Sequence, residues 1–88
     1  MESPKLRVRE LLHSSLRALR GGNLFLAERA ANEAMGVALD YEIHSGIVSA
    51  LVVQARIARF YGDYEQAHMS AREALRWHRL HVTPARSP

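Results

Sequence analysis

The sequence predicts an all-α fold of four helices, arranged as two antiparallel helical hairpins. The chain of 88 residues is 48% hydrophobic and rich in alanine, which suits close helix–helix contact. Its apolar residues recur with helical spacing. Two stretches 40 residues apart also match: Gly22 or Gly62 is followed by a helix-capping residue, a large apolar residue and three alanines. The matched alanines are Ala27, Ala31 and Ala34 in the first stretch, and Ala67, Ala71 and Ala74 in the second.

The first hairpin is expected to contain helices over residues 4–20 and about 23–39. Ser3 and Pro4 suit the cap and first turn of the first helix, and the pair Gly21-Gly22 ends it. Asn23 caps the second helix. The inner face of that helix is predicted to hold Leu24, Ala27, Ala31, Ala34, Met35 and Ala38. Gly36 is a weak point there, permitting close packing or a bend.

The second hairpin is expected to contain helices over about 42–61 and 63–81. Asp40 is the predicted cap of the third helix, whose many apolar residues indicate burial on more than one face. Asp63 caps the fourth helix. The predicted inward-facing residues of this helix are Ala67, Ala71, Ala74 and Leu75. We expect a single domain over 1–82 and a disordered tail over 83–88.

Composition excludes several function classes. The chain has no cysteine, which rules out disulfides and thiolate metal sites, and no apolar run of about 18 residues that would span a membrane. No signal peptide, phosphate-binding glycine loop or Ser/His/Asp arrangement is evident, so we expect a cytoplasmic, non-enzymatic protein without a cofactor. The net charge of +3 lies in residues 45–88, and it is weak evidence for nucleic-acid binding, which we do not expect.

The repeated stretches resemble the tetratricopeptide (TPR) family, whose unit is a helix–turn–helix with small residues between its helices. The matching positions are Leu11, Ser15, Ala18, Gly22, Leu24, Ala27, Ala31 and Ala34, then Leu51, Ala55, Ala58, Gly62, Tyr64, Ala67, Ala71 and Ala74. The period is 40 residues rather than about 34, and the family's usual proline is absent. The chain thus resembles the longer, alanine-rich TPR-like repeats of bacterial regulatory proteins; the alternative is a generic alanine-rich four-helix bundle.

The resemblance implies a protein-interaction module that binds a peptide or partner helix on the inner surface of the first helix of each pair. The residues that it places there are Arg9, Leu12, His13, Leu16, Arg20, Val52, Arg56, Arg59 and Phe60. Arginines beside apolar side chains suit an acidic segment or one ending in a carboxylate. The alternative is that the arginines form a solvated face, while Leu16 and Val52 belong to the core.

Two hairpins are fewer than the three or so repeats that usually bury a continuous core. We therefore expect a homodimer that covers the apolar surface of the third helix and the surroundings of Phe25, Tyr61 and Trp77.

A runner-up function rests on Arg72 and His78, whose spacing resembles the Arg/His pair of HEPN ribonucleases. His78 and His81 are a weak candidate pair of metal ligands, because no cysteine or carboxylate nearby completes a site.

Overall fold

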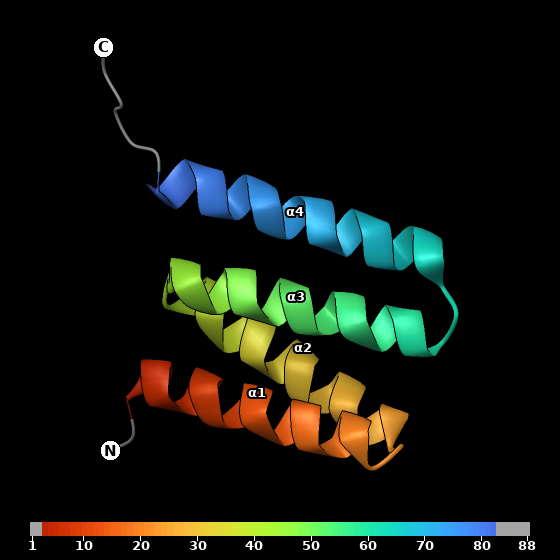
Figure 1. Cartoon of the computed structure of the whole chain (residues 1–88). Coiled ribbons are helices and arrows are strands. Elements are labelled where there is room, and N and C mark those ends of the chain that lie inside the picture. Colours follow the sequence, from red (N-terminus) through yellow and green to blue (C-terminus); the bar gives the residue numbers. More distant parts are fainter. Residues whose placement is uncertain (1–2, 83–88) are drawn as a thin grey trace.

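The computed structural model describes residues 3–82 and shows four α-helices and no strand within them. In chain order they are α1 (Pro4–Arg20), α2 (Leu24–Asp40), α3 (His44–Phe60) and α4 (Tyr64–Val82) (Figure 1). The predicted all-α class and the two antiparallel hairpins, α1 with α2 and α3 with α4, are confirmed. The predicted tail at 83–88 lies outside the described residues.

The two hairpins stack through α3. This helix packs on α4 within its own hairpin and also on α1 and α2 of the first hairpin, which confirms that it is buried on more than one face. Helices α1 and α3 run side by side in the same direction, and α4 lies at the far end of the stack (Figure 1). The stack therefore has an α1–α3 face and two ends, one of which is formed by α3 and α4.

The three turns between the helices share one hydrogen-bonded motif. In each turn, the third residue donates its N–H to an alanine carbonyl five residues earlier, which is the long bond of a Schellman cap. These bonds run from Asn23, Ile43 and Asp63 to Ala18, Ala38 and Ala58, over 2.8–2.9 Å. The middle residue has positive φ in every case: 81° at Gly22 and Gly62, and 53° at Glu42. Identical turns give the helices starting points 20 residues apart.

The turn between α2 and α3 differs from the prediction. Asp40 does not cap α3, because it is the last residue of α2, which runs one residue beyond the expected end at Leu39. The N-cap is Ile43, which has no side-chain capping hydrogen bond. Glu42 adopts the left-handed conformation without being a glycine, so no glycine signals this turn. As a result, α3 begins two residues later than expected, and it ends at Phe60 instead of residue 61.

The other predicted caps are confirmed. The Oγ of Ser3 accepts a hydrogen bond from the N–H of Leu6, and the Oδ1 of Asn23 accepts one from Leu26, each over 3.1 Å. Asp63 caps α4 in the same way, through the N–H of Gln66. Three of the four helices thus begin with a side-chain cap that was readable in the sequence.

The alanine stripe of α2 forms the centre of the core. Its buried members are Ala27, Ala31, Ala34 and Ala38, as predicted. In α4, Ala67 and Ala74 are buried, but the predicted inward-facing Ala71 and Leu75 are exposed. Helix α3 covers the side of α2 that carries Ala31, whereas no described helix covers the corresponding side of α4.

Gly36 and Gly46 both lie in helices, but only Gly46 lies in a closely packed place. The close packing considered for Gly36 does not occur, because a Cβ added there would meet nothing within 4 Å. Gly46, near the start of α3, is instead buried where α1, α2 and α3 meet. A Cβ at Gly46 would lie 3.1 Å from Val8 Cγ1 and 3.2 Å from Ala38 Cβ. The absence of a side chain at Gly46 lets α3 approach the first hairpin.

Candidate functional site

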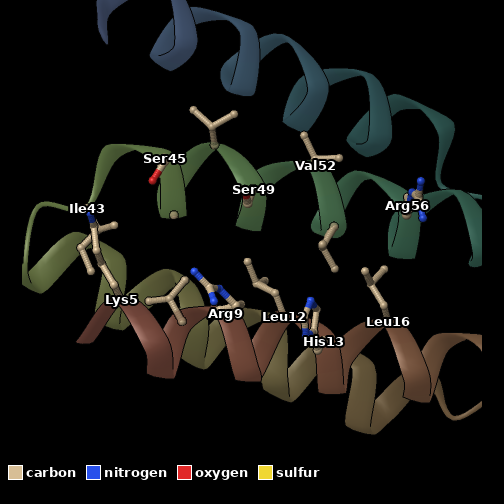
Figure 2. A pocket seen from close by; sticks show the side chains of 14 residues that line it. Lys5, Arg9, Leu12, His13, Leu16, Ile43, Ser45, Ser49, Val52 and Arg56 are labelled. Carbon is tan, nitrogen blue, oxygen red and sulfur yellow. The ribbon is translucent and has the colours of Figure 1, made fainter. Parts of the chain in front are cut away.

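A long groove lies on the α1–α3 face, in two adjoining hollows. The first hollow runs along the N-terminal and middle parts of both helices (Figure 2). The second continues toward their C-terminal ends and shares Leu16 and Arg56 with the first. We call the two hollows together the α1–α3 groove. Because the two helices run in the same direction, successive turns of each present a new pair of side chains along it.

The groove has an apolar floor that belongs to the protein core. Val8, Leu12 and Val53 are buried and line its deepest part, and Leu16 is half-buried. On the α3 side, small residues contribute to the lining, namely Ser45, Gly46 and Ser49. Small side chains on one helix facing leucines on the other leave an open depression between them.

Cationic side chains surround this floor. Lys5 and Arg9 line the first hollow, Arg56 lines both hollows, and Arg20 and Arg59 line the second. All five are exposed, no carboxylate lines either hollow, and none of the five is paired with a carboxylate in the described part of the chain. The groove therefore concentrates positive charge in a protein whose net charge is only +3.

The opposite face has the reverse character. A hollow between α2, α3 and α4 is lined by Glu28 and Asp63 together with several amides, and no Lys or Arg lines it. All three of these amides make hydrogen bonds, since Gln54 donates to Asn32 over 3.0 Å and Gln66 donates to Ser70 over 3.2 Å. The α1–α3 groove and this third hollow are thus lined by charges of opposite sign.

The structure brings all nine predicted partner-binding residues to the groove. The first hollow contains Arg9, Leu12, His13, Leu16, Val52 and Arg56, and the second contains Leu16, Arg20, Arg56, Arg59 and Phe60. Leu12 forms part of the buried floor, whereas of the two residues that the alternative assigns to the core, Leu16 is half-buried and Val52 is exposed. Val52 is 45% exposed and points toward α4 (Figure 2), at the margin of the groove.

Ten further lining residues were not predicted, and the exposed ones among them are Lys5, Ser45, Ser49 and Tyr64. Lys5 lies one helical turn before Arg9, a spacing that places both residues on one face and that identifies Lys5 from sequence. Ser45 and Ser49 carry no such signal, because a serine on a helix is equally common on any exposed face. Tyr64 lines the groove from the start of α4, and its place there depends on the angle between the two hairpins.

The Arg/His pair on α4 does not form a comparable site. Arg72 and His78 are both exposed, and neither lines any of the three hollows described above. Six positions on a helix correspond to a rise of about 9 Å and a rotation of about 120° between side chains. The HEPN-like reading stays a prediction without a cavity that supports it.

The described residues hold neither a cluster of metal ligands nor a membrane-spanning helix. No group of three or more His, Asp or Glu side chains there is placed to hold a metal ion, and the side chain of His81 lies outside the described part. None of the described helices combines the length and hydropathy required to cross a membrane.

Comparison with known proteins finds no match for this chain among family models, curated proteins or solved structures. The groove and its chemistry must therefore be interpreted from the chain's own residues.

Proposed function

We propose that this protein is a non-enzymatic interaction module that binds an acidic, extended peptide segment of a partner protein in the α1–α3 groove. The observation that carries the proposal is the composition of the groove: five cations and no carboxylate around an apolar floor. The TPR-like reading of the repeats, and its link to bacterial regulators, are part of the same proposal. A cytoplasmic location is the setting that we expect for it.

The chemistry of the groove favours a peptide with carboxylates at spaced positions. Arginine presents a planar fork that binds a carboxylate through two parallel hydrogen bonds. Arg9 and Arg56 offer such forks from the two helices at different points along the groove, so each is available to a separate carboxylate of the peptide. Single exposed ion pairs contribute only about 0–1 kcal/mol each, so a stable complex requires several of them together with apolar contacts.

Apolar anchors are available for this purpose. Phe60 is exposed at the C-terminal end of the groove, next to Arg59 and Tyr64 in the lining of the second hollow. Leu16 is half-buried at the junction of the two hollows. A peptide with an aromatic or aliphatic side chain flanked by acidic residues packs on these apolar anchors and pairs with the cations around them. Buried aromatic anchors and arginines are the residue types that dominate measured binding energies.

The test is the affinity of the full chain for a fluorescein-labelled acidic peptide that contains leucine and ends in a free carboxylate, measured by anisotropy. We expect Arg56→Glu to weaken binding at least about tenfold, a change of about 1.4 kcal/mol in binding free energy. Arg17→Glu is the matched control, because Arg17 lies near the end of α1 as Arg56 lies near the end of α3, but lines neither hollow.

Two results would contradict the proposal. Equal losses for Arg56→Glu and Arg17→Glu would show that net charge, and not the groove, determines binding. Single-stranded RNA that binds more tightly than the peptide, with an affinity that falls steeply with salt, would indicate phosphate recognition. Phe60→Ala separates the two ligands further, because loss of an apolar anchor weakens the peptide complex and leaves a purely electrostatic one nearly unchanged.

We also propose that the chain self-associates. Several large apolar side chains are exposed, among them Phe25, Tyr61 and Tyr64, and apolar surface of this kind commonly marks an interface. Trp77, which was part of the predicted apolar surface, is half-buried against His44, with ring centroids 5.8 Å apart. Trp77 therefore contributes to the fold of the second hairpin more than to an interface.

A further inference from the structure

The two hairpins can be compared position by position, because residues 40 apart occupy equivalent places in the repeat. Two such pairs differ strongly in burial. Leu12 is 7% exposed and its equivalent Val52 is 45% exposed; Ala31 is fully buried and its equivalent Ala71 is exposed. The surface that carries Leu12 and Ala31 on the first hairpin is thus covered, whereas the equivalent surface of the second hairpin is open.

The element that covers this surface of the first hairpin is α3, which belongs to the second hairpin. The backbone of Gly46 approaches both Val8 on α1 and Ala38 on α2, so α3 sits between these two helices. The equivalent surface of the second hairpin lies on α3 and α4. We call it the C-terminal edge and define it by Val48, Val52, Tyr64, Ala71 and Leu75. Apart from the half-buried Val48, these residues are exposed.

The opposite end of the stack is chemically different. Gly46, Ala50, Val53 and Ile57 are buried and follow one another at helical spacing on one side of α3, and Gly46 on this side packs against Val8 and Ala38 of the first hairpin. Their equivalents 40 residues earlier are Leu6, Glu10, His13 and Arg17. Stacking a second copy head to tail would bury Glu10 and Arg17 against the apolar C-terminal edge, which costs free energy without a paired charge. The two ends are therefore not complementary, and open-ended stacking is disfavoured.

The charges of α4 favour pairing of two identical edges. Asp63 and Glu65 lie at the start of the helix, whereas Arg72 and Arg76 lie toward its end, where Arg76 is also paired with Glu73 over 3.1 Å. When two α4 helices lie antiparallel, the acidic start of each faces the basic end of the other, and their dipoles also oppose. A parallel arrangement would bring like charges together. Ala71, a small residue between Tyr64 and Leu75, permits close approach of the two helices at the middle.

We infer that two copies of this chain pair across a twofold axis through their C-terminal edges, with α4 antiparallel to α4 of the second copy and Ala71 near the axis. A twofold interface uses the same patch on both subunits and closes on itself. The inference rests on the self-association proposed above. The edge shares Val48, Val52 and Tyr64 with the lining of the peptide groove but includes none of its cationic side chains.

The first test is the mass of the full chain in solution, by sedimentation and light scattering up to high micromolar concentration. Leu75→Lys is the edge variant and Leu26→Lys the matched control, because both leucines are 48% exposed on helices and only Leu75 belongs to the edge. We expect Leu75→Lys to weaken the dimer at least about tenfold, as for a residue at the centre of an interface. Leu26→Lys should leave the dissociation constant unchanged.

The second test uses the absence of cysteine in the chain. A single Ala71→Cys variant should form an intermolecular disulfide under mild oxidation, since residues on the axis meet their own copies. Met69→Cys is the control: two positions along a helix turn the side chain by about 200°, so it points away from the edge. A charge-exchange experiment tests the antiparallel arrangement independently. We expect Glu65→Arg to weaken the dimer, and the double variant that also carries Arg76→Glu to restore it.

The outcomes separate the two proposals. A monomer at every concentration overturns both the twofold pairing and the self-association. A dimer that resists Leu75→Lys and does not cross-link through residue 71 overturns the C-terminal edge alone and leaves self-association in place. Peptide binding by the Leu75→Lys variant reports separately on the groove, so its loss or retention does not affect this inference.

Discussion

Replacing Gly46 with alanine adds one methyl group where three helices meet. The added Cβ would lie 3.1 Å from Val8 Cγ1, 3.2 Å from Ala38 Cβ and 3.3 Å from Ile43 Cγ2. Optimal carbon–carbon separations are about 3.5–4.0 Å, so each neighbour must move by a few tenths of an ångström. Val8 and Ile43 have side-chain freedom to do so, whereas the Cβ of Ala38 is fixed to the backbone of α2.

The expected change in the free energy of unfolding of Gly46→Ala is the sum of two opposing contributions. Alanine in place of glycine within a helix stabilises it by up to about 1 kcal/mol, and less in the first turn, where Gly46 lies. Overpacking a filled core costs about 1–3 kcal/mol. We therefore expect Gly46→Ala to lower the free energy of unfolding by about 1 kcal/mol.

Gly36→Ala is the matched comparison. Gly36 lies within α2, is exposed, and has open space around the position of a Cβ. Only the helix-propensity term applies there, so this variant should be more stable than the parent by up to about 1 kcal/mol. The same substitution is thus expected to have opposite signs at the two glycines, with a difference of about 2 kcal/mol between the variants.

Urea unfolding followed by circular dichroism measures both variants directly, provided that the slope with denaturant is unchanged. Measurements at a low, constant protein concentration keep self-association from contributing to the apparent stability. If Gly46→Ala is as stable as Gly36→Ala, the close approach of α3 to Val8 and Ala38 does not limit packing, and the argument from Gly46 fails.

Two further predictions concern the turns and the core. Glu42→Gly should raise the free energy of unfolding by about 0.5–1 kcal/mol, because relief of the left-handed conformation at φ 53° exceeds the added chain entropy of glycine; thermal unfolding that shows a loss would refute it. Ser15→Ala should cost about 1 kcal/mol, since the buried Ser15 Oγ donates a 2.6 Å hydrogen bond to the Ala27 carbonyl. An unchanged urea midpoint would show that this bond makes no net contribution.

Much of the groove could be predicted from the sequence, because helical periodicity assigns each residue to a face once the register is known. Arg9, His13 and Leu16 follow one another at helical spacing, and Arg56 and Phe60 do so on α3. The repeat then predicts that the two faces lie side by side. Tyr64 could not be predicted in this way, because its place in the groove depends on the angle between the two hairpins.

The sequence by itself determined the features that depend on neighbours along the chain. Ser3, Asn23 and Asp63 begin helices, and the turns with Gly22 or Gly62 end α1 and α3, because capping hydrogen bonds and backbone conformation act within a few residues. The alanine pattern likewise identified the buried face of α2. These local signals suffice for the fold class and for three of the four helix starts.

Only the tertiary structure decided which equivalent positions are covered. Ala31 and Ala71 carry the same side chain at the same place in the repeat, yet one is buried and the other exposed, because α3 covers the first hairpin and no described helix covers the second. Gly46 and Gly36 differ for the same reason: their surroundings come from helices distant in sequence. Burial is a property of contacts between helices, and a pattern along one helix does not contain them.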